Sequence, residues 1–303
     1  MCQSQRLAKL LAIICGRLPQ KVMSIYRHIP RPPLRQHVQW LWYYDDLQTD
    51  HQREHVLPDG SFDLIINLEN RPRKLFDRHD AERFSSFKRG WLSGAHEEFL
   101  IIDALPGSTM IGAHFKPGGA AKFLGLPASE LGRQVVEVDA VWGAGIWEWR
   151  DRLMEAPGAQ AKFSVLEQML QQRMVAGSAK LRENNGVTWA IEQFVREPHY
   201  HSISAVSRRL GVSHKQFIEQ FRREVGLTPK LFCRIRRFQE VLARIHAQKS
   251  VRWADVACSC GYFDQAHFVN DFVAFAGVNP SAYLDRRLEE DWNFVRAADG
   301  AAR

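Results

Sequence analysis

The sequence predicts an α+β protein of two domains. An N-terminal β-barrel or β-sandwich with trailing helices is followed by an all-α domain with two helix-turn-helix motifs. The chain of 303 residues is long enough for two ordinary domains. Short apolar segments between Pro and Gly turns dominate the first third, as in barrels and sandwiches. Residues 203–283 contain one pattern of glycine and apolar residues twice, which predicts the duplicated motif.

Domain boundaries follow changes in composition along the chain. Residues 1–24 are predicted to be an extension, either a poorly ordered helix or a stretch upstream of a true start at Met23. The other parts are, in order, the N-terminal domain, a polar turn-rich linker, the C-terminal domain and a tail, at residues 25–176, 177–186, 187–287 and 288–303. No apolar run reaches the roughly 18 residues that a membrane-spanning helix needs. Five scattered cysteines form no disulfide framework, so a reducing, cytoplasmic compartment is expected.

Strands are predicted in the N-terminal domain wherever apolar residues alternate between turn residues. Three prolines argue against a helix before Leu34, and residues 34–42 are predicted to form either a short helix or a strand. Residues 54–68 are predicted to form two strands around a turn at residues 58–60. Residues 71–89 are polar and are predicted to form a loop or an irregular hairpin. Further short strands are predicted at residues 91–92, 99–104 and 110–115.

A change of period after residues 116–119 predicts the trailing helices. One of them, at residues 163–175, repeats apolar residues on a single amphipathic face. The others are predicted at residues 120–124, 128–132 and 141–153. The Lys-Pro-Gly-Gly sequence at residues 116–119 forms either a simple strand-to-helix turn or a nest of backbone N–H groups. A nest with the charge of Lys116 would bind an anionic effector.

The repeat in the C-terminal domain is offset by 50 residues up to its first glycine and by 51 after it. Copy two therefore has one extra residue in its turn. The first copy contains Val206, Gly211, Phe217, Phe221, Gly226, Pro229 and Phe232. The second contains Val256, Gly261, Phe268, Phe272, Gly277, Pro280 and Tyr283. Glycine in the turn and apolar residues at helical spacing predict a duplicated helix-turn-helix, and hence DNA binding.

The second helix of copy one is predicted at residues 213–224, with Ser213 as its N-cap. Its N-terminal residues would meet base edges in the major groove. Lysine can reach guanine and glutamine can pair with adenine, whereas the arginines are expected to contact phosphates. The predicted DNA-binding residues of this helix and its flank are His214, Lys215, Gln216, Glu219, Arg222 and Arg223.

In copy two the second helix is predicted at residues 264–274, with Asp264 as its N-cap. A connecting helix at residues 228–247 would span about 30 Å, close to the ~34 Å pitch of DNA. It could hold the two reading helices in successive major grooves. The predicted DNA-binding residues of the connector and of copy two are Arg234, Arg237, Gln265, Ala266, His267 and Asn270.

Positive charge is concentrated in copy one and the connector. Residues 203–249 hold 11 Lys and Arg against 3 Asp and Glu, whereas residues 251–284 hold 1 against 3. A basic module suits a polyanion such as DNA. Most phosphate contacts are therefore expected from copy one and the helix that follows it.

The C-terminal half resembles the AraC/XylS-type transcriptional regulators over residues 187–284. The similarity is carried by SHKQFIEQFRREVGLTPK at residues 213–230, GYFDQAHFVNDF at residues 261–272 and GVNPSAYL at residues 277–284. Where that family often has basic residues after the final reading helix, this chain has Val273, Ala274 and Phe275. This departure agrees with the charge distribution and argues against strong phosphate binding by copy two.

The N-terminal half resembles the cupin-like sensor domain of one branch of that family, over residues 25–153. The similar segments are VLPDGSFDLIINL at residues 56–68 and GAHFKPGGAAKFLGLPASEL at residues 112–131. The resemblance implies effector sensing or dimerisation. Metal-dependent cupins cluster His-x-His with a downstream Glu, whereas the histidines here are scattered. Asp59 and Asp63 flank a turn and are expected to make turn hydrogen bonds rather than to catalyse.

These features predict a sequence-specific DNA-binding transcription regulator, controlled by an unidentified small molecule or by dimerisation through the N-terminal domain. Expected partners are double-stranded operator DNA, the effector, a second copy of the chain and, for an activator, RNA polymerase. No catalytic residue, cofactor or metal is expected. One alternative is a DNA-tethered enzyme similar to repair alkyltransferases, although their four-cysteine zinc cluster and Pro-Cys-His-Arg segment are missing. The other is an architectural protein with little preference among DNA sequences.

Overall fold

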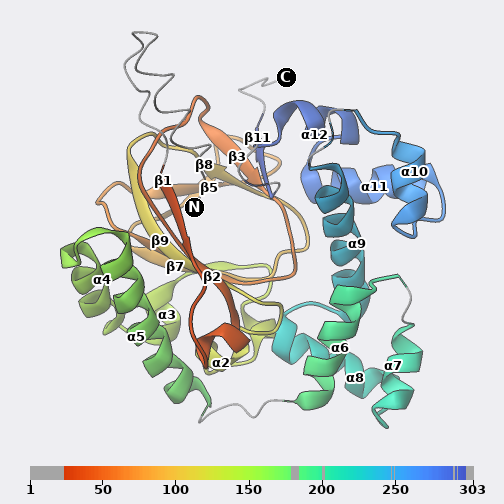
Figure 1. Ribbon diagram of the computed structural model, residues 1–303, viewed down its shortest axis with the longest axis horizontal. Helices are drawn as coiled ribbons and strands as arrows, with labels where there is room; N and C mark the ends of the chain where they lie inside the picture. The colour runs from red at the N-terminus through yellow and green to blue at the C-terminus, as the bar shows by residue number, and fades with distance from the viewer. Residues whose placement is uncertain are drawn as a thin grey trace, which may run out of the picture.

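The computed structural model describes residues 24–178, 184–199, 202–246, 248, 250–288, 291 and 293–297. Almost all of the predicted extension and the centre of the predicted linker lie outside these residues. Figure 1 shows a β-rich part flanked by helices α2 to α5, and beside it a helical part in which α9 runs next to the strands. The predicted α+β class with two domains is confirmed.

The first sheet of the N-terminal domain has six antiparallel strands in the order β1-β2-β9-β4-β7-β10. The strands are Ser24–His28, Val38–Leu47, Ser108–Phe115, Asp63–Asn67, Gly90–Ser93 and Val135–Glu137. Alternate residues such as Leu41, Leu64 and Ile111 are fully buried, as expected when one face of a sheet covers a core. β10 was not predicted, because its three residues are too few to show a period.

The second sheet has the order β11-β3-β8-β5-β6, also antiparallel. Its strands are Phe294–Arg296, Arg53–Val56, Leu100–Asp103, Arg73–Phe76 and Phe84–Phe87. The hairpin of β5 and β6 occupies the polar stretch predicted as a loop or an irregular hairpin. β11 comes from the segment assigned to the tail, and Val295, opposite His55, is fully buried.

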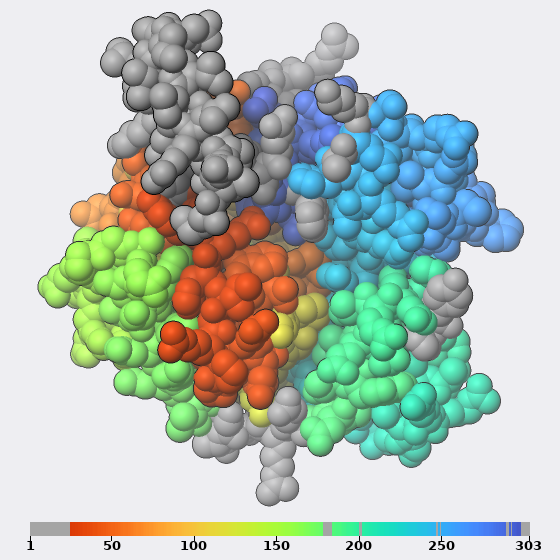
Figure 2. Space-filling model, in the orientation of Figure 1, coloured from red at the N-terminus to blue at the C-terminus, as the bar shows by residue number. Residues whose placement is uncertain are grey.

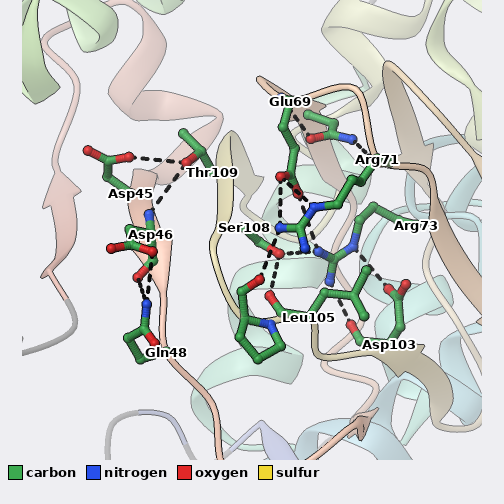
Figure 3. A network of polar contacts seen from close by, with 12 residues as sticks. Asp45, Asp46, Gln48, Glu69, Arg71, Arg73, Asp103, Leu105, Ser108 and Thr109 are labelled. Carbon is green, nitrogen blue, oxygen red and sulfur yellow. Dashed lines mark hydrogen bonds and ion pairs between the residues drawn. The ribbon is translucent and has the colours of Figure 1, made fainter.

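A buried polar network joins the two sheets (Figure 3). Arg73 of β5 donates from Nε to the carboxylate of Asp103 at 3.0 Å and from Nη2 to its carbonyl at 2.8 Å. A third bond runs from Arg73 to Ser108 on β9 of the first sheet. The side chains of Arg73 and Asp103 are both buried, so each charge is stabilised by the other. Removing one partner of such a pair typically costs about 3–5 kcal/mol of folding stability.

Short and long helices cover the N-terminal domain. The 3-10 helices η1 and η2 span Leu34–Gln36 and Ala128–Glu130, and the α-helices α2, α3, α4 and α5 span Ala121–Leu124, Val138–Trp142, Ile146–Glu155 and Gly158–Ser178. α5 is longer than the predicted helix at residues 163–175. Its side chains Phe163, Leu166 and Leu170 are buried, in line with the predicted amphipathic face.

The C-terminal domain contains helices α6 to α12. They span Asn185–Arg196, Ile203–Arg209, His214–Val225, Pro229–Ile245, Trp253–Ser259, Gln265–Ala276 and Pro280–Arg286. All of these helices except α10 begin after an Asn, Ser, Thr or Asp whose side-chain oxygen accepts a backbone N–H. The capping residues thus determine where these helices begin, independently of tertiary packing.

The two domains share one continuous hydrophobic core. The ring of Phe232 on α9 lies against Gly60, where a Cβ atom would come within 2.7 Å of it. Gln239 of α9 donates to the carbonyl of Pro58 at 2.9 Å. Figure 2 shows the orange and the cyan-to-blue halves in direct contact. Within the described residues, no helix is both long and apolar enough to cross a membrane.

Candidate nucleic-acid interface

The first reading helix, α8, has one aromatic face and one polar face. Ser213 caps it by accepting the N–H of Gln216 at 3.2 Å, and Gly226 ends it in the left-handed conformation. Phe217 and Phe221 are fully buried against each other, with ring centroids 5.8 Å apart. All six DNA-binding residues predicted in copy one lie exposed around the rest of this helix, at His214, Lys215, Gln216, Glu219, Arg222 and Arg223.

The second reading helix, α11, repeats this design. Asp264 caps it by accepting the N–H of His267 at 2.7 Å, and Gly277 ends it in the left-handed conformation. Its inner face is Phe268, Phe272 and Phe275, all buried. Of the four predicted contacts, Gln265, Ala266 and Asn270 are exposed and His267 is half-buried.

The structure gives Arg234 and Arg237 of α9 intramolecular partners that the sequence did not predict. Arg234 donates from Nε and Nη2 to one oxygen of the buried Asp271 on α11, at 3.2 and 2.6 Å. Arg237 donates from Nη1 to the carbonyl of Gly261 at 3.2 Å, and its guanidinium lies 5.1 Å from the ring centre of Tyr262. Both arginines therefore hold copy two against the connector. Their contact with DNA stays a prediction.

A groove of about 640 Å³ separates the two copies. It is bordered by the start of α7, by α9 and by α11. Its charged lining includes Lys230, Arg234 and Arg237, against a single carboxylate from Asp271. The positive charge that the sequence assigns to copy one and the connector thus continues to the edge of copy two.

The N-terminal domain holds the C-terminal ends of both reading helices, which sequence reasoning missed. A Cβ atom on Gly132 would lie 2.6 Å from the carbonyl oxygen of Gly226, so the backbones at the end of α8 and after η2 are in contact. At the end of α11, Gly277 packs on the ring of Phe99, and His55 bonds the carbonyl of Ala276. Gly226 and Gly277 occupy equivalent positions in the repeat. The repeat predicted where the two reading helices end, but it did not predict that the N-terminal domain covers these ends.

The turn at residues 58–60 joins the N-terminal domain to α9. Arg236 donates to the carbonyl of Asp59 at 3.1 Å. The carboxylate of Asp59 makes a turn bond to the N–H of Ser61 and also lies 3.1 Å from His114 Nε2, while Asp63 lies 2.9 Å from Nδ1. Burial alone would lower the pKa of His114, but the two carboxylates raise that pKa well above its ordinary value.

A second groove, of about 860 Å³, runs between the domains. The N-terminal domain contributes the Lys-Pro-Gly-Gly segment at residues 116–119, and the C-terminal domain contributes Ile191 and Glu192 of α6 and Arg223 of α8. Gly118 sits so close to Ile191 that a Cβ atom would come within 2.6 Å of its side chain. The segment therefore lies where the N-terminal domain meets copy one.

The C-terminal region also matches a known family. Residues 206–286 match a family described as a helix-turn-helix domain, and residues 26–137 match a domain of unknown function, DUF6597. No curated protein matches this sequence.

Solved structures of ToxT from Vibrio cholerae are similar to this chain. An apo ToxT variant from strain SCE256 is 12% identical, covering 81% of this chain and 96% of that one, with a TM-score of 0.43. Wild-type ToxT bound to an unsaturated fatty acid, from the same strain, is 10% identical, covering 80% of this chain and 94% of that one, with a TM-score of 0.42.

The match at residues 206–286 and the duplicated motif of α7–α8 and α10–α11 define the class of protein. The protein is a DNA-binding transcription regulator. The C-terminal domain is a helix-turn-helix domain with two such motifs, as the sequence predicts, and it follows an N-terminal β domain.

Proposed function

We propose that the protein is a sequence-specific transcription regulator whose operator has two half-sites, one read by α8 and one by α11. The observation that carries this proposal is the pair of separately capped helices, each with a buried aromatic face and an exposed polar face. Lys215 and Gln216 would contact base edges, and Arg222 and Arg223 would contact phosphates. On α11 the proposed contacts are Gln265, Ala266, His267 and Asn270.

The length of α9 supports two half-sites one helical turn apart. Its 17 residues measure about 25 Å at 1.5 Å per residue. Half-sites of helix-turn-helix proteins lie ~34 Å apart. The difference between the length of α9 and this half-site spacing is close to the ~10 Å diameter of one helix. The reading helices on either side of α9 supply this additional distance.

We also propose that a small anionic effector acts in the groove between the domains. A ligand there would touch residues 116–119 of the N-terminal domain and α6 and α8 of the C-terminal domain together. The cations Lys116, Lys122 and Arg223 outnumber the lining carboxylates of Glu192 and Glu224, which favours an anion. Ile191 and Val195 supply apolar surface. We propose in addition that the protein forms a homodimer through its N-terminal domain. If it is an activator, RNA polymerase is a further partner.

The thiols of Cys233 and Cys260 favour a regulator over an alkyl-transferring enzyme. Burial raises the pKa of the Cys233 thiol to about 12, and burial also raises that of Cys260. A nucleophilic cysteine needs a lowered pKa, because the thiolate is the reactive form. These thiols therefore stay protonated at neutral pH.

Selection of bound sequences from a random DNA library, at about physiological salt, tests the proposal. Two conserved elements about 10 base pairs apart are expected. A single short element would mean that α11 contributes little to recognition. No enrichment, together with similar affinity for all sequences, would favour the architectural alternative.

The effector proposal has its own test. Thermal unfolding of the full chain is measured with a panel of small carboxylates and phosphates. At least one should raise Tm for the wild type and have less effect on Lys116→Ala. A shift that is equal in both proteins would contradict binding at residues 116–119.

A further inference from the structure

The extra residue in the turn of copy two is Phe263. In copy one, Gly211 is followed by Val212 and then by the N-cap Ser213. In copy two, Gly261 is followed by Tyr262, Phe263 and then the N-cap Asp264. Tyr262 is buried, and Phe263 is 94% exposed. The insertion thus places an aromatic side chain in solvent, directly before the second reading helix.

The outward direction of Phe263 is fixed by its neighbours. Tyr262 fills the interior, with its ring centroid 5.3 Å from that of Phe268. On its N-terminal side, Gly261 has a φ of +72° and its carbonyl accepts from Arg237. Because the turn is held at these points, Phe263 has no room to exchange places with Tyr262. Phe263 therefore presents an apolar ring to any partner that binds this side of copy two.

The exposed side of α11 carries no lysine or arginine. Beyond Phe263 it presents Gln265, Ala266, Asn270 and Val273, and the cap is the carboxylate of Asp264. The exposed side of α8, by contrast, presents one lysine and two arginines. Phosphate neutralisation, which dominates most protein–DNA affinity, is therefore weak in copy two. Contacts to base edges have to carry a larger share of its binding.

We infer that Phe263 contacts the C5-methyl group of a thymine, so that the half-site read by copy two contains A·T pairs. This inference rests on the proposed function. The thymine methyl is the apolar group displayed in the major groove, where Ala and Phe side chains meet it. The N-terminal residues of the second helix lie in that groove, and Phe263 immediately precedes them. The amides of Gln265 and Asn270 are suited to adenine, the partner of thymine.

The test removes the methyl group without changing base pairing. In the operator obtained by selection, each thymine of the second half-site is replaced in turn by deoxyuridine. Kd is measured by fluorescence anisotropy for the full-length wild type, Phe263→Ala and Phe84→Ala. Phe84 is an exposed phenylalanine on β6, remote in sequence from copy two, and provides a matched control. Thermal unfolding checks that Phe263→Ala, which alters an exposed side chain, keeps its fold.

The wild type should lose about fourfold in affinity on one deoxyuridine probe, the value for one buried methyl-sized group. Phe84→Ala should lose affinity on that probe as the wild type does. Phe263→Ala should bind the thymine probe and the deoxyuridine probe with equal affinity.

Three results would overturn this inference and leave the proposed function intact. In the first, the wild type binds a specific operator with no loss of affinity on any deoxyuridine probe. In the second, Phe263→Ala still binds the thymine probe more tightly than the deoxyuridine probe. In the third, Phe263→Ala has unchanged DNA binding and reduced transcription, which would mean that the ring contacts a protein. A failure to select any operator overturns the proposed function as well.

Discussion

His55 of strand β3 donates its Nδ1–H to the carbonyl of Ala276, the last residue of reading helix α11, at 2.9 Å. The imidazole is buried and stacks on Phe99, with ring centroids 4.5 Å apart. Phe99 in turn packs on Gly277. The N-terminal domain thus caps a reading helix directly, and the position of α11 depends on the sheet that carries His55.

Acidification should destabilise the folded state that contains this contact. Burial lowers the pKa of His55 in the folded protein below its ordinary value near 6.5. As pH falls through about 6.5, the unfolded state takes up a proton that the folded state does not, so stability is lost. Between pH 7.5 and 5.5 the wild type should lose about 1 kcal/mol more than His55→Gln. Urea unfolding at both pH values measures the difference, and equal losses in the two proteins would contradict the assignment.

Breaking the pair of Arg234 and Asp271 should loosen copy two. Arg234→Gln leaves a buried carboxylate without its main donor. We expect a loss of about 2 kcal/mol, less than the roughly 3–5 kcal/mol typical of a fully buried pair, because Arg234 is partly exposed. Footprinting should show weaker protection of the second half-site than of the first.

The control for this pair is the double variant Arg234→Gln with Asp271→Asn. Because the carboxylate is then gone, the double variant should be more stable than the sum of the single losses predicts. Strictly additive losses would mean that the ion pair does not couple α9 to α11.

Strand β11 should be needed to hold the C-terminal end of the chain on the N-terminal domain. Val295→Asp places a charge at a fully buried position and should cost about 3 kcal/mol or detach the strand. Hydrogen exchange of the β3 amides should then become faster. Arg296→Gln is the neighbouring control. Because Arg296 is exposed and its carboxylate partner Asp50 lies 3.4 Å away in solvent, a change under about 0.5 kcal/mol is expected.

Two exposed residues of α8 should affect binding in different ways. Gln216→Ala should change the preferred base at one position, with about 1–3 kcal/mol of discrimination lost there. Arg222→Ala should weaken all sequences similarly and reduce the salt slope by about 1. Competition binding at several salt concentrations separates the two effects. If both variants lose affinity equally on every probe, specific readout by α8 is wrong.

Local signals in the sequence predicted most of the C-terminal domain. Ser213 and Asp264 cap the reading helices as predicted, and Gly226 and Gly277 lie where those helices end. The N-terminal strands were predicted less completely. β1 and β10 were missed, and residues 34–42 were left open between helix and strand. Short strands carry few periods, and their partners are far away in sequence, so their pairing leaves little trace in local composition.

The sequence by itself determined the repeat, the caps, the charge difference between the copies and the extra residue Phe263. These features are visible in the sequence as spacings of three or four residues, as a repeat offset of 50 or 51 residues, or as composition. Only the tertiary structure decided that β11 pairs with β3, that Arg234 bonds Asp271, and that His55 reaches the end of α11. The last contact joins residues 221 positions apart. Such contacts form because the whole core brings two distant surfaces together, and no spacing within either segment specifies its partner.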